Sequence, residues 1–236
     1  MGRAAITSGG AGDVIISVPI MKMLGISTLY IKESFYPEGY GSMYSGLKEL
    51  IELQGFSVLP TKDDGLGFDN FEAGVRYDVN MDAWRCMRGR GRDYIAKTMQ
   101  DYFRVMRRDW RAPWLVLDDV PTPLTGTDYT VWFLSPRWRQ SDYDWKGGFQ
   151  SVPGNKIFIG FEADWKAFCQ EVGQIEYVFT PDFMAMARLI RDCRALYCNQ
   201  GPAVAIAQGI GHLYYCAFKS MKTNVRLYTK NENALI

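Results

Sequence analysis

The chain has 236 residues, of which 47% are hydrophobic and 22% are charged, and its formal net charge is +1. This is the composition of an ordinary globular protein, and the length suffices for one large domain or two small ones. A net charge so close to zero argues against binding of nucleic acid over the whole surface. The only histidine is His212, which nearly excludes a zinc site of the usual kind and a Ser-His triad.

No secretory signal or membrane-spanning helix is expected. The apolar run Val14 to Ile26 is interrupted by Pro19 and Lys22, and no stretch approaches the roughly 20 apolar residues that cross a bilayer. The five cysteines include no Cys-x-x-Cys pair, and Cys193 and Cys198 are expected to be buried thiols. The sequence therefore predicts a soluble, cytoplasmic protein.

The chain opens with the pattern strand, glycine-rich loop, helix. A β-type run from Arg3 to Thr7 is followed by Ser8-Gly9-Gly10-Ala11-Gly12-Asp13 and then by an apolar stretch to Leu24. The spacing meets neither the dinucleotide-binding nor the P-loop fingerprint. Asp13 has two interpretations. It is either a cap at the amino end of the helix, or a carboxylate at a strand's carboxyl edge that serves as a general base.

The rest of the amino-terminal half alternates between strands and helices, which favours a parallel sheet. Strands are expected at Ser27–Lys32 and Phe56–Leu59, with a helix over Leu47–Gln54 between them. Toward the end of this half, Trp110 and Trp114 are interpreted as packing residues at a domain junction rather than as a stacking platform.

The segment 85–111 is strongly basic, with nine basic residues against three acids. A helix is expected at its centre because apolar residues recur there at helical spacing, namely Ile95, Met99, Tyr102 and Met106. One interpretation is a solvated helix face with local acidic partners. The other is a basic wall for a polyanionic acceptor, either a nucleic acid or a phosphorylated glycan, to which Arg88, Arg90 and Arg92 would bind.

Two prolines and a glycine in the segment 118–127 mark the expected boundary between two domains, residues 1–125 and 126–236. A strand over Tyr129–Leu134 then leads through Ser135 into a long polar loop that contains Arg137, Arg139 and Trp145. Because the two arginines follow a strand's carboxyl end, their guanidinium groups are candidates to clamp a diphosphate. A second alternation of strands and helices follows. The expected elements are strands at Lys156–Phe161, Tyr177–Phe179, Leu213–Phe218 and near Asn224–Tyr228, and helices at Ala163–Val172 and Phe183–Cys193.

The stretch Tyr197 to Gly209 predicts a short buried strand, a tight turn and a helix of small residues. The turn is Asn199-Gln200-Gly201-Pro202, in which Gly201 permits a sharp bend and Pro202 suits the first helical position. The free N–H groups of such a first turn are a natural seat for a phosphate. The alternative is an ordinary strand-to-helix turn of an α/β domain.

Two Rossmann-like halves facing a central cleft resemble the GT-B glycosyltransferase fold. Three short motifs are similar to those of the ADP-heptose:lipopolysaccharide heptosyltransferases, glycosyltransferase family 9. They are Gly12-Asp13-Val14-Ile15 with Pro19 and Leu24, Phe158-Ile159-Gly160 with Glu162, and Asn199-Gln200-Gly201-Pro202 with Ala207. The motifs touch both halves, whereas the middle third of the chain matches poorly.

The resemblance implies an inverting transfer of a sugar from a nucleotide-diphospho-sugar to an acceptor hydroxyl, with no metal and no cofactor besides the donor. It makes Asp13 the base that deprotonates the acceptor. It matches Gly201 and Pro202 to the turn that holds the phosphates of the donor. The predicted donor site as a whole comprises Gly12, Ser135, Arg137, Arg139, Gly160, Asn199, Gln200, Gly201 and Pro202. The acceptor would be a glycan or another polyanion.

The sequence departs from the family at two positions. Asn199 stands where the family usually has Asp, and Val204 stands where it usually has His. The chain is also shorter than a typical member. Asn199 and Val204 favour an alternative to the enzyme, an inactive GT-B-like module that binds a nucleotide, glycan or protein partner. A third alternative rests on the basic segment 85–111 and is a glycosyltransferase that modifies DNA. The sugar, the nucleotide and the oligomeric state stay undetermined.

Overall fold

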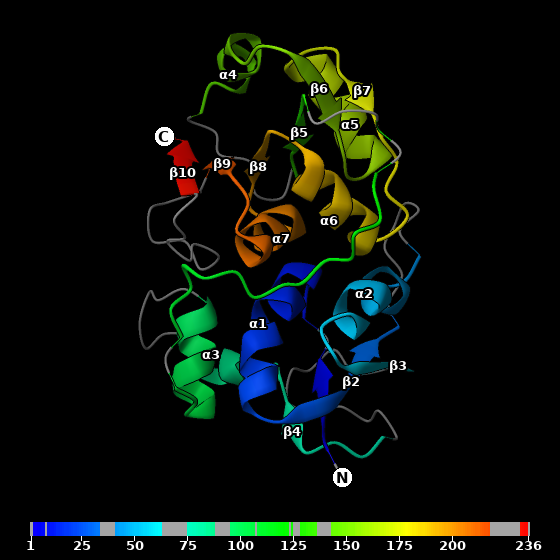
Figure 1. Cartoon of the computed structure of the whole chain (residues 1–236), viewed down its shortest axis with the longest axis vertical. Coiled ribbons are helices and arrows are strands. Elements are labelled where there is room, and N and C mark those ends of the chain that lie inside the picture. The colour runs from blue at the N-terminus through cyan, green and yellow to red at the C-terminus, as the bar shows by residue number, and fades with distance from the viewer. Residues whose placement is uncertain are drawn as a thin grey trace.

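The computed structural model describes residues 2–7, 9–33, 41–62, 75–87, 95–106, 108–122, 124, 128–135, 143–217 and 232–235. These residues form two parallel β-sheets, one in each half of the chain, with helices packed on them (Figure 1). The predicted α/β class with two Rossmann-like halves is confirmed. The predicted boundary at 125/126 lies outside the described residues.

The amino-terminal sheet has the strand order β3-β2-β1-β4, and its strands run parallel. Its strands are β1 (Arg3–Thr7), β2 (Ile26–Lys32), β3 (Ser57–Thr61) and β4 (Val79–Asn80). Its helices are α1 (Ala11–Met23), α2 (Met43–Glu52), the 3-10 helix η1 (Ala83–Met87) and α3 (Ile95–Phe103). The chain adds β2 and β3 on one side of β1, then returns to add β4 on the other side. The strand order therefore reverses between β1 and β4, and ligands of open α/β sheets bind at the strands' carboxyl ends beside such a switch point.

The carboxyl-terminal sheet has the order β10-β9-β8-β5-β6-β7 and is likewise parallel. Its strands are β5 (Tyr129–Phe133), β6 (Asn155–Phe158), β7 (Glu176–Tyr177), β8 (Ala195–Asn199), β9 (Tyr214–Ala217) and β10 (Glu232–Leu235). Its helices are α4 (Trp145–Ser151), α5 (Glu162–Glu171), α6 (Phe183–Asp192) and α7 (Pro202–Ile210). Here β6 and β7 follow on one side of β5, and β8 lies on the other, so the switch point of this sheet lies between β5 and β8.

The two halves meet helix on helix, with α1 packed on α7 and α2 packed on α6 (Figure 1). Helix α1 is buried on nearly all sides, including Ile15 and Val18, because it is covered both by its own sheet and by α7. Helix α7 contributes small buried side chains such as Ala203 and Ala207, which let the two helix backbones approach closely. The contact between the halves is thus part of the hydrophobic core.

The segment that joins the halves, drawn in green across the middle of Figure 1, is bonded to both of them. The backbone N–H groups of Trp114 and Leu115 donate to the Gly209 carbonyl of α7 at 2.7 and 2.9 Å. The next residue, Val116, exchanges two hydrogen bonds with the side chain of Gln54, which follows α2, at 2.8 and 2.9 Å. Trp114 is buried, as is Trp110, and their rings pack edge to face. Both tryptophans are therefore packing residues at the junction, as predicted.

Arg188 of α6 binds both the segment that joins the halves and helix α2 of the amino-terminal half. Its guanidinium donates to Asp118 and, at 2.5 Å, to Glu49 Oε1 on α2. These charge-assisted hydrogen bonds with Asp118 and Glu49 raise the pKa of Arg188, although burial works against its charge. The ion pair Arg188–Glu49 thus links the two halves across the α2–α6 contact.

The structure corrects several predicted elements. The polar loop after Ser135 includes a helix, α4, because Asp144 accepts a hydrogen bond from Gly147 N as its N-cap and Trp145 is buried. Helix α2 begins earlier than predicted because Ser42 and Ser45 form a capping box. The strand predicted near 224–228 lies outside the described residues, and the last described strand is β10. Neither β4 nor η1 was predicted.

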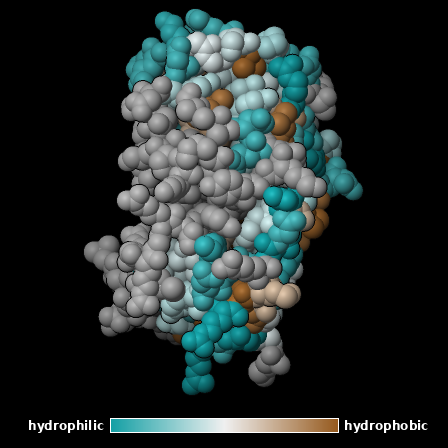
Figure 2. Space-filling model, turned by 90° about the vertical axis from the view of Figure 1, so that its left-hand side faces the viewer, coloured by the Kyte–Doolittle hydropathy of each residue, from teal (hydrophilic) through white to brown (hydrophobic). Residues whose placement is uncertain are grey.

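Cys193 and Cys198 are buried, as predicted. No helix in the described part of the chain is long and apolar enough to cross a bilayer. No cluster of potential metal ligands occurs among those residues. Figure 2 views the molecule from the left-hand side of Figure 1. Among the residues coloured by hydropathy on this face, hydrophilic ones predominate and hydrophobic ones form small separate spots.

Candidate functional site

The two glycine-containing turns that the sequence singled out lie against each other. A Cβ atom placed on Gly12 would lie 3.6 Å from the carbonyl oxygen of Gly201 and 3.8 Å from the Cα of Pro202. Gly12 belongs to the first turn of α1, after β1, while Gly201 and Pro202 lie between β8 and α7. The fold therefore brings the switch points of both sheets together. Gly12 and Gly201, which meet there, are 189 positions apart in the sequence.

Asp13 is not the cap of α1. The N-cap residue is Gly10, which forms no side-chain capping hydrogen bond, and Asp13 lies within the first turn. Its carboxylate accepts a hydrogen bond from the Nη2 atom of Arg85 on η1. The Asp13 side chain keeps 21% of its surface exposed, so it lies at the margin of the core rather than inside it.

Arg85 joins Asp13 to a second, buried carboxylate. Its Nε atom donates to Asp82 Oδ1 at 3.2 Å, and the Thr7 hydroxyl donates to Asp82 Oδ2 at 3.2 Å. The guanidinium also lies over the ring of Trp84, 4.7 Å from its centroid. Burial opposes the charge on Arg85, but Asp13 and Asp82 outweigh it and raise the pKa of the guanidinium above its usual value. At neutral pH, Arg85 is therefore a fixed cation held between two carboxylates.

Sequence reasoning placed Arg85 in the basic wall and did not single out Asp82. The local signal was present, since Asp82 and Arg85 are three residues apart in one helical turn directly after β4. Arg108, another member of that segment, donates to the carbonyl groups of Ala112 and Pro113. These two arginines are thus used within the fold. The predicted acceptor residues Arg88, Arg90 and Arg92 lie outside the described residues.

The donor-side turn is shaped by one aromatic ring. A Cβ on Gly201 would lie 2.7 Å from Phe133 Cε1, so a glycine is required there by close approach. Gly160, after β6, has φ +122°, and a Cβ on it would lie 3.3 Å from the same ring. The Tyr177 hydroxyl donates to the Gly160 carbonyl at 2.9 Å. The structure therefore assembles Gly160 and Gly201 on the two sides of Phe133, at the carboxyl end of β5.

The remaining donor-side residues differ in how they are placed. Asn199 is fully buried, and its side chain is bonded to the backbone of Ser135. Gln200 is 3% exposed. Pro202 begins α7, as predicted, after an N-cap residue, Gly201, that makes no side-chain capping bond. Arg137 and Arg139 lie outside the described residues.

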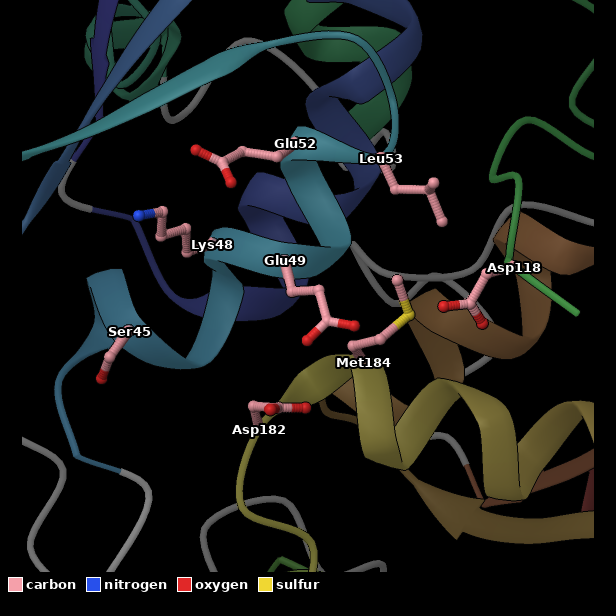
Figure 3. Close-up of a pocket in the computed structure, with 8 residues that line it drawn as sticks. All are labelled: Ser45, Lys48, Glu49, Glu52, Leu53, Asp118, Asp182 and Met184. Carbon is pink, nitrogen blue, oxygen red and sulfur yellow. The ribbon is translucent and has the colours of Figure 1, made fainter. Parts of the chain in front are cut away.

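A surface pocket lies apart from these turns, between α2 and the start of α6. It is lined by Ser45, Lys48, Glu49, Glu52, Leu53, Asp118, Asp182 and Met184. In Figure 3, Glu49 and Met184 face each other across the gap between the two helices. Three of the four carboxylates at this pocket already serve the fold: Glu49 and Asp118 bind Arg188, and Asp182 caps α6 by accepting from Ala185 N at 2.7 Å. The meeting of the turns, not this pocket, is therefore the candidate site.

The chain is similar to known proteins in its structure. No family model matches the sequence, and no curated protein matches it either. Among solved structures, a glycosyltransferase family 9 protein from Veillonella parvula superposes with a TM-score of 0.65 at 14% identity, over 98% of this chain and 84% of that one. The chain has the fold of glycosyltransferase family 9.

Two Escherichia coli enzymes with the family 9 fold give similar matches. Heptosyltransferase WaaC with ADP-2-deoxy-2-fluoro heptose superposes with a TM-score of 0.60 at 11% identity, over 98% of this chain and 91% of that one. ADP-heptose LPS heptosyltransferase II superposes with a TM-score of 0.55 at 11% identity, over 100% of this chain and 90% of that one. The likeness covers nearly the whole of this chain in each case.

Proposed function

We propose that the protein is a glycosyltransferase that moves a sugar from a nucleotide-diphospho-sugar to an acceptor hydroxyl, with inversion and without a metal ion. The observation that carries this proposal is the contact between the Gly12-Asp13 turn and the Gly201-Pro202 turn at the two switch points. It brings the first turn of α1, which carries Asp13, against the amino terminus of α7, whose N-cap residue is a glycine. Structures with this fold include a heptosyltransferase bound to a fluorinated analogue of ADP-heptose.

In this proposal the diphosphate of the donor lies at the Gln200-Gly201-Pro202 turn. The first N–H groups of α7 have no acceptor within the helix, and the N-cap residue Gly201 has no side chain that could bond to them. They would stabilise the charge that builds on the nucleoside diphosphate as it leaves. Arg137 and Arg139, which follow β5 in sequence, are proposed as additional guanidinium partners.

Asp13 is proposed as the base. As the acceptor oxygen bonds to the anomeric carbon, the bond from that carbon to the phosphate oxygen breaks, and the hydroxyl proton passes to Asp13. A single displacement of this kind needs its base and its leaving group on opposite sides of the sugar. The proposal assigns Asp13 to one side and the Gln200-Gly201-Pro202 turn to the other. Protonation removes the negative charge of Asp13, but Arg85 keeps Asp82 as its second carboxylate partner. The cation is therefore not left unpaired when Asp13 accepts the proton.

A non-catalytic binding module is the second candidate, and two observations favour it. The side chain of Asn199 is bonded to Ser135, and Val204 is fully buried in the core. Neither side chain therefore offers a polar contact to a donor at the positions where the family resemblance implies an Asp and a His. As such a module, the protein would still bind a phosphate at the backbone of the Gln200-Gly201-Pro202 turn, but it would not catalyse sugar transfer.

The test is a screen of ADP-, UDP-, GDP- and CMP-sugars for thermal stabilisation, followed by an assay of nucleotide release from each stabilising donor. A ligand at 100 times its dissociation constant stabilises the folded state by about 2.7 kcal/mol. Stabilisation with release supports the enzyme, and stabilisation without release, with glycan acceptors supplied, supports the binding module. No stabilisation by any of the four donors would overturn the proposed donor site.

A further inference from the structure

Asn199 and Ser135 lie at the switch point of the carboxyl-terminal sheet. Asn199 is the last residue of β8, and Ser135 follows β5, its parallel neighbour. The two strand ends flank the point at which open α/β sheets bind their ligands. The residues directly after Asn199 form the Gln200-Gly201-Pro202 turn. A bond between these strand ends therefore controls the shape of the proposed donor seat.

The side chain of Asn199 makes that bond twice. Its Oδ1 atom accepts from the backbone N–H of Ser135 at 2.9 Å, and its Nδ2 atom donates to the Ser135 carbonyl at 2.7 Å. Asn199 is fully buried. A buried amide that both accepts from and donates to one main-chain residue holds that residue in one place and orientation.

This geometry specifies an uncharged amide. An ionised carboxylate only accepts hydrogen bonds. At this position it would keep the bond from the Ser135 N–H, but its other oxygen would face the Ser135 carbonyl oxygen, with no proton between them. A protonated carboxylic acid, in contrast, carries one donor and one acceptor and reproduces the pattern of the amide.

We infer that Asn199 is a positioning residue that clasps the end of β5 to the donor turn, a role that rests on the proposed function. The ring of Phe133 contributes the apolar side of the same arrangement, since it fills the space beside Gly201. Asn199 therefore acts on the donor through the backbone, without touching it. An acidic side chain at this position weakens the site instead of adding a contact.

The test compares the wild type with Asn199→Asp from about pH 5 to about pH 9, a range that spans the raised pKa of a buried carboxyl. ADP, UDP and GDP are titrated first against the wild type, and the tightest binder is the probe. The ratio of dissociation constants, variant to wild type, is expected to be near one at the acidic end. It is expected to reach about tenfold or more at the alkaline end, once the carboxyl is ionised. The ratio removes the pH dependence of the nucleotide itself.

Two further variants complete the design. Asn199→Leu can form neither bond, so its weakening should not change with pH. Asn155→Asp adds the same charge at an exposed position on β6, at the amino end of the same sheet, and should bind like the wild type at every pH. All titrations are made well below the melting temperatures, so that every variant is folded. If Asn199 served only the stability of the fold, its replacement would lower the melting temperature and leave the affinity ratio unchanged.

The outcomes separate the two ideas. A ratio for Asn199→Asp that stays flat across the pH range, with a wild type that binds the probe, overturns the clasp and leaves the proposed function standing. A wild type that binds none of the three nucleotides overturns the proposed donor site and the clasp together.

Discussion

Gly12 faces the carbonyl group of Gly201 so closely that a Cβ atom added to it would be in van der Waals contact, 3.6 Å from the oxygen. Alanine fits at that distance, and it should stabilise α1 by roughly 0.5–1 kcal/mol because glycine is a poor helix residue. Leucine would extend into the turn, so Gly12→Leu should weaken donor binding while Gly12→Ala leaves it intact. Unfolding in urea and titration of the donor measure the two effects, and equal binding by both variants would contradict the placement of the donor.

Gly201→Ala should destabilise the protein by about 1–3 kcal/mol, because the new methyl group overlaps the ring of Phe133 at 2.7 Å. The ring is buried and has little space into which it can move. In the double variant with Phe133→Leu, the penalty of the alanine should shrink. A double-mutant cycle by denaturant unfolding measures this coupling, and purely additive effects would show that the ring does not shape the turn.

Asp13→Asn should lower the rate of sugar transfer by roughly 10²- to 10⁴-fold, the usual contribution of a general base, while donor affinity is retained. The amide still accepts a hydrogen bond from Arg85, so the fold should persist. The measurements are nucleotide release and donor titration, with Asp119→Asn at an exposed position as the matched control. Unchanged turnover would remove Asp13 from the mechanism.

Arg85→Met should cost about 3–5 kcal/mol of stability, because it leaves the buried carboxylate of Asp82 without its cation. The Arg85 side chain is 10% exposed and that of Asp82 is 2% exposed, so water replaces little of the lost pairing. Arg111→Met, at an exposed position, is the control and should change stability by no more than about 0.5 kcal/mol. Similar losses in the two variants would mean that the ion pair with Asp82 contributes little.

His212 makes stability depend on pH. Its Nε2 atom lies 3.3 Å from the sulfur of Cys193, and burial lowers the pKa of the imidazole despite the nearby charge of Asp192. The unfolded chain therefore binds a proton near pH 6.5 that the folded chain resists, so stability falls as the pH drops below about 6.5. His212→Gln should show a smaller loss between about pH 7.5 and pH 5.5. Parallel pH profiles of the free energy of unfolding would rule this contribution out.

Burial also raises the pKa of the Cys193 thiol to about 12. The sulfur therefore stays a neutral thiol beside the imidazole, and it donates to the Ile190 carbonyl at 3.2 Å. The pair is not a thiolate–imidazolium nucleophile, so the pH effect predicted for His212 concerns folding and not catalysis.

The features that could be predicted from the sequence are those encoded locally. The glycine-rich loop followed by an apolar run predicts β1 and α1, and Pro202 after Gly201 predicts the start of α7. Each signal lies within a few residues, where backbone preferences of glycine and proline decide the conformation. The two turns of the candidate site were identified in the same way.

The partners of those turns could not be predicted, because they come from distant segments. Arg85 is 72 residues from Asp13, and Asn199 is 64 residues from Ser135. No local pattern fixes such pairs; they follow from the return of β4 to the side of β1 and from the pairing of β5 with β8. Strand β4 itself has only two residues, too few for an alternating pattern to appear.

The joining segment changes its attachment from one half to the other almost residue by residue. Leu115 is bonded to α7, Val116 to Gln54 after α2, and Asp118 to Arg188 of α6. A free linker would let the halves melt one after the other, but here neither half can open without breaking bonds that belong to the other. Together with the apolar contact of α1 and α7, these bonds predict that the two halves unfold together as one cooperative unit.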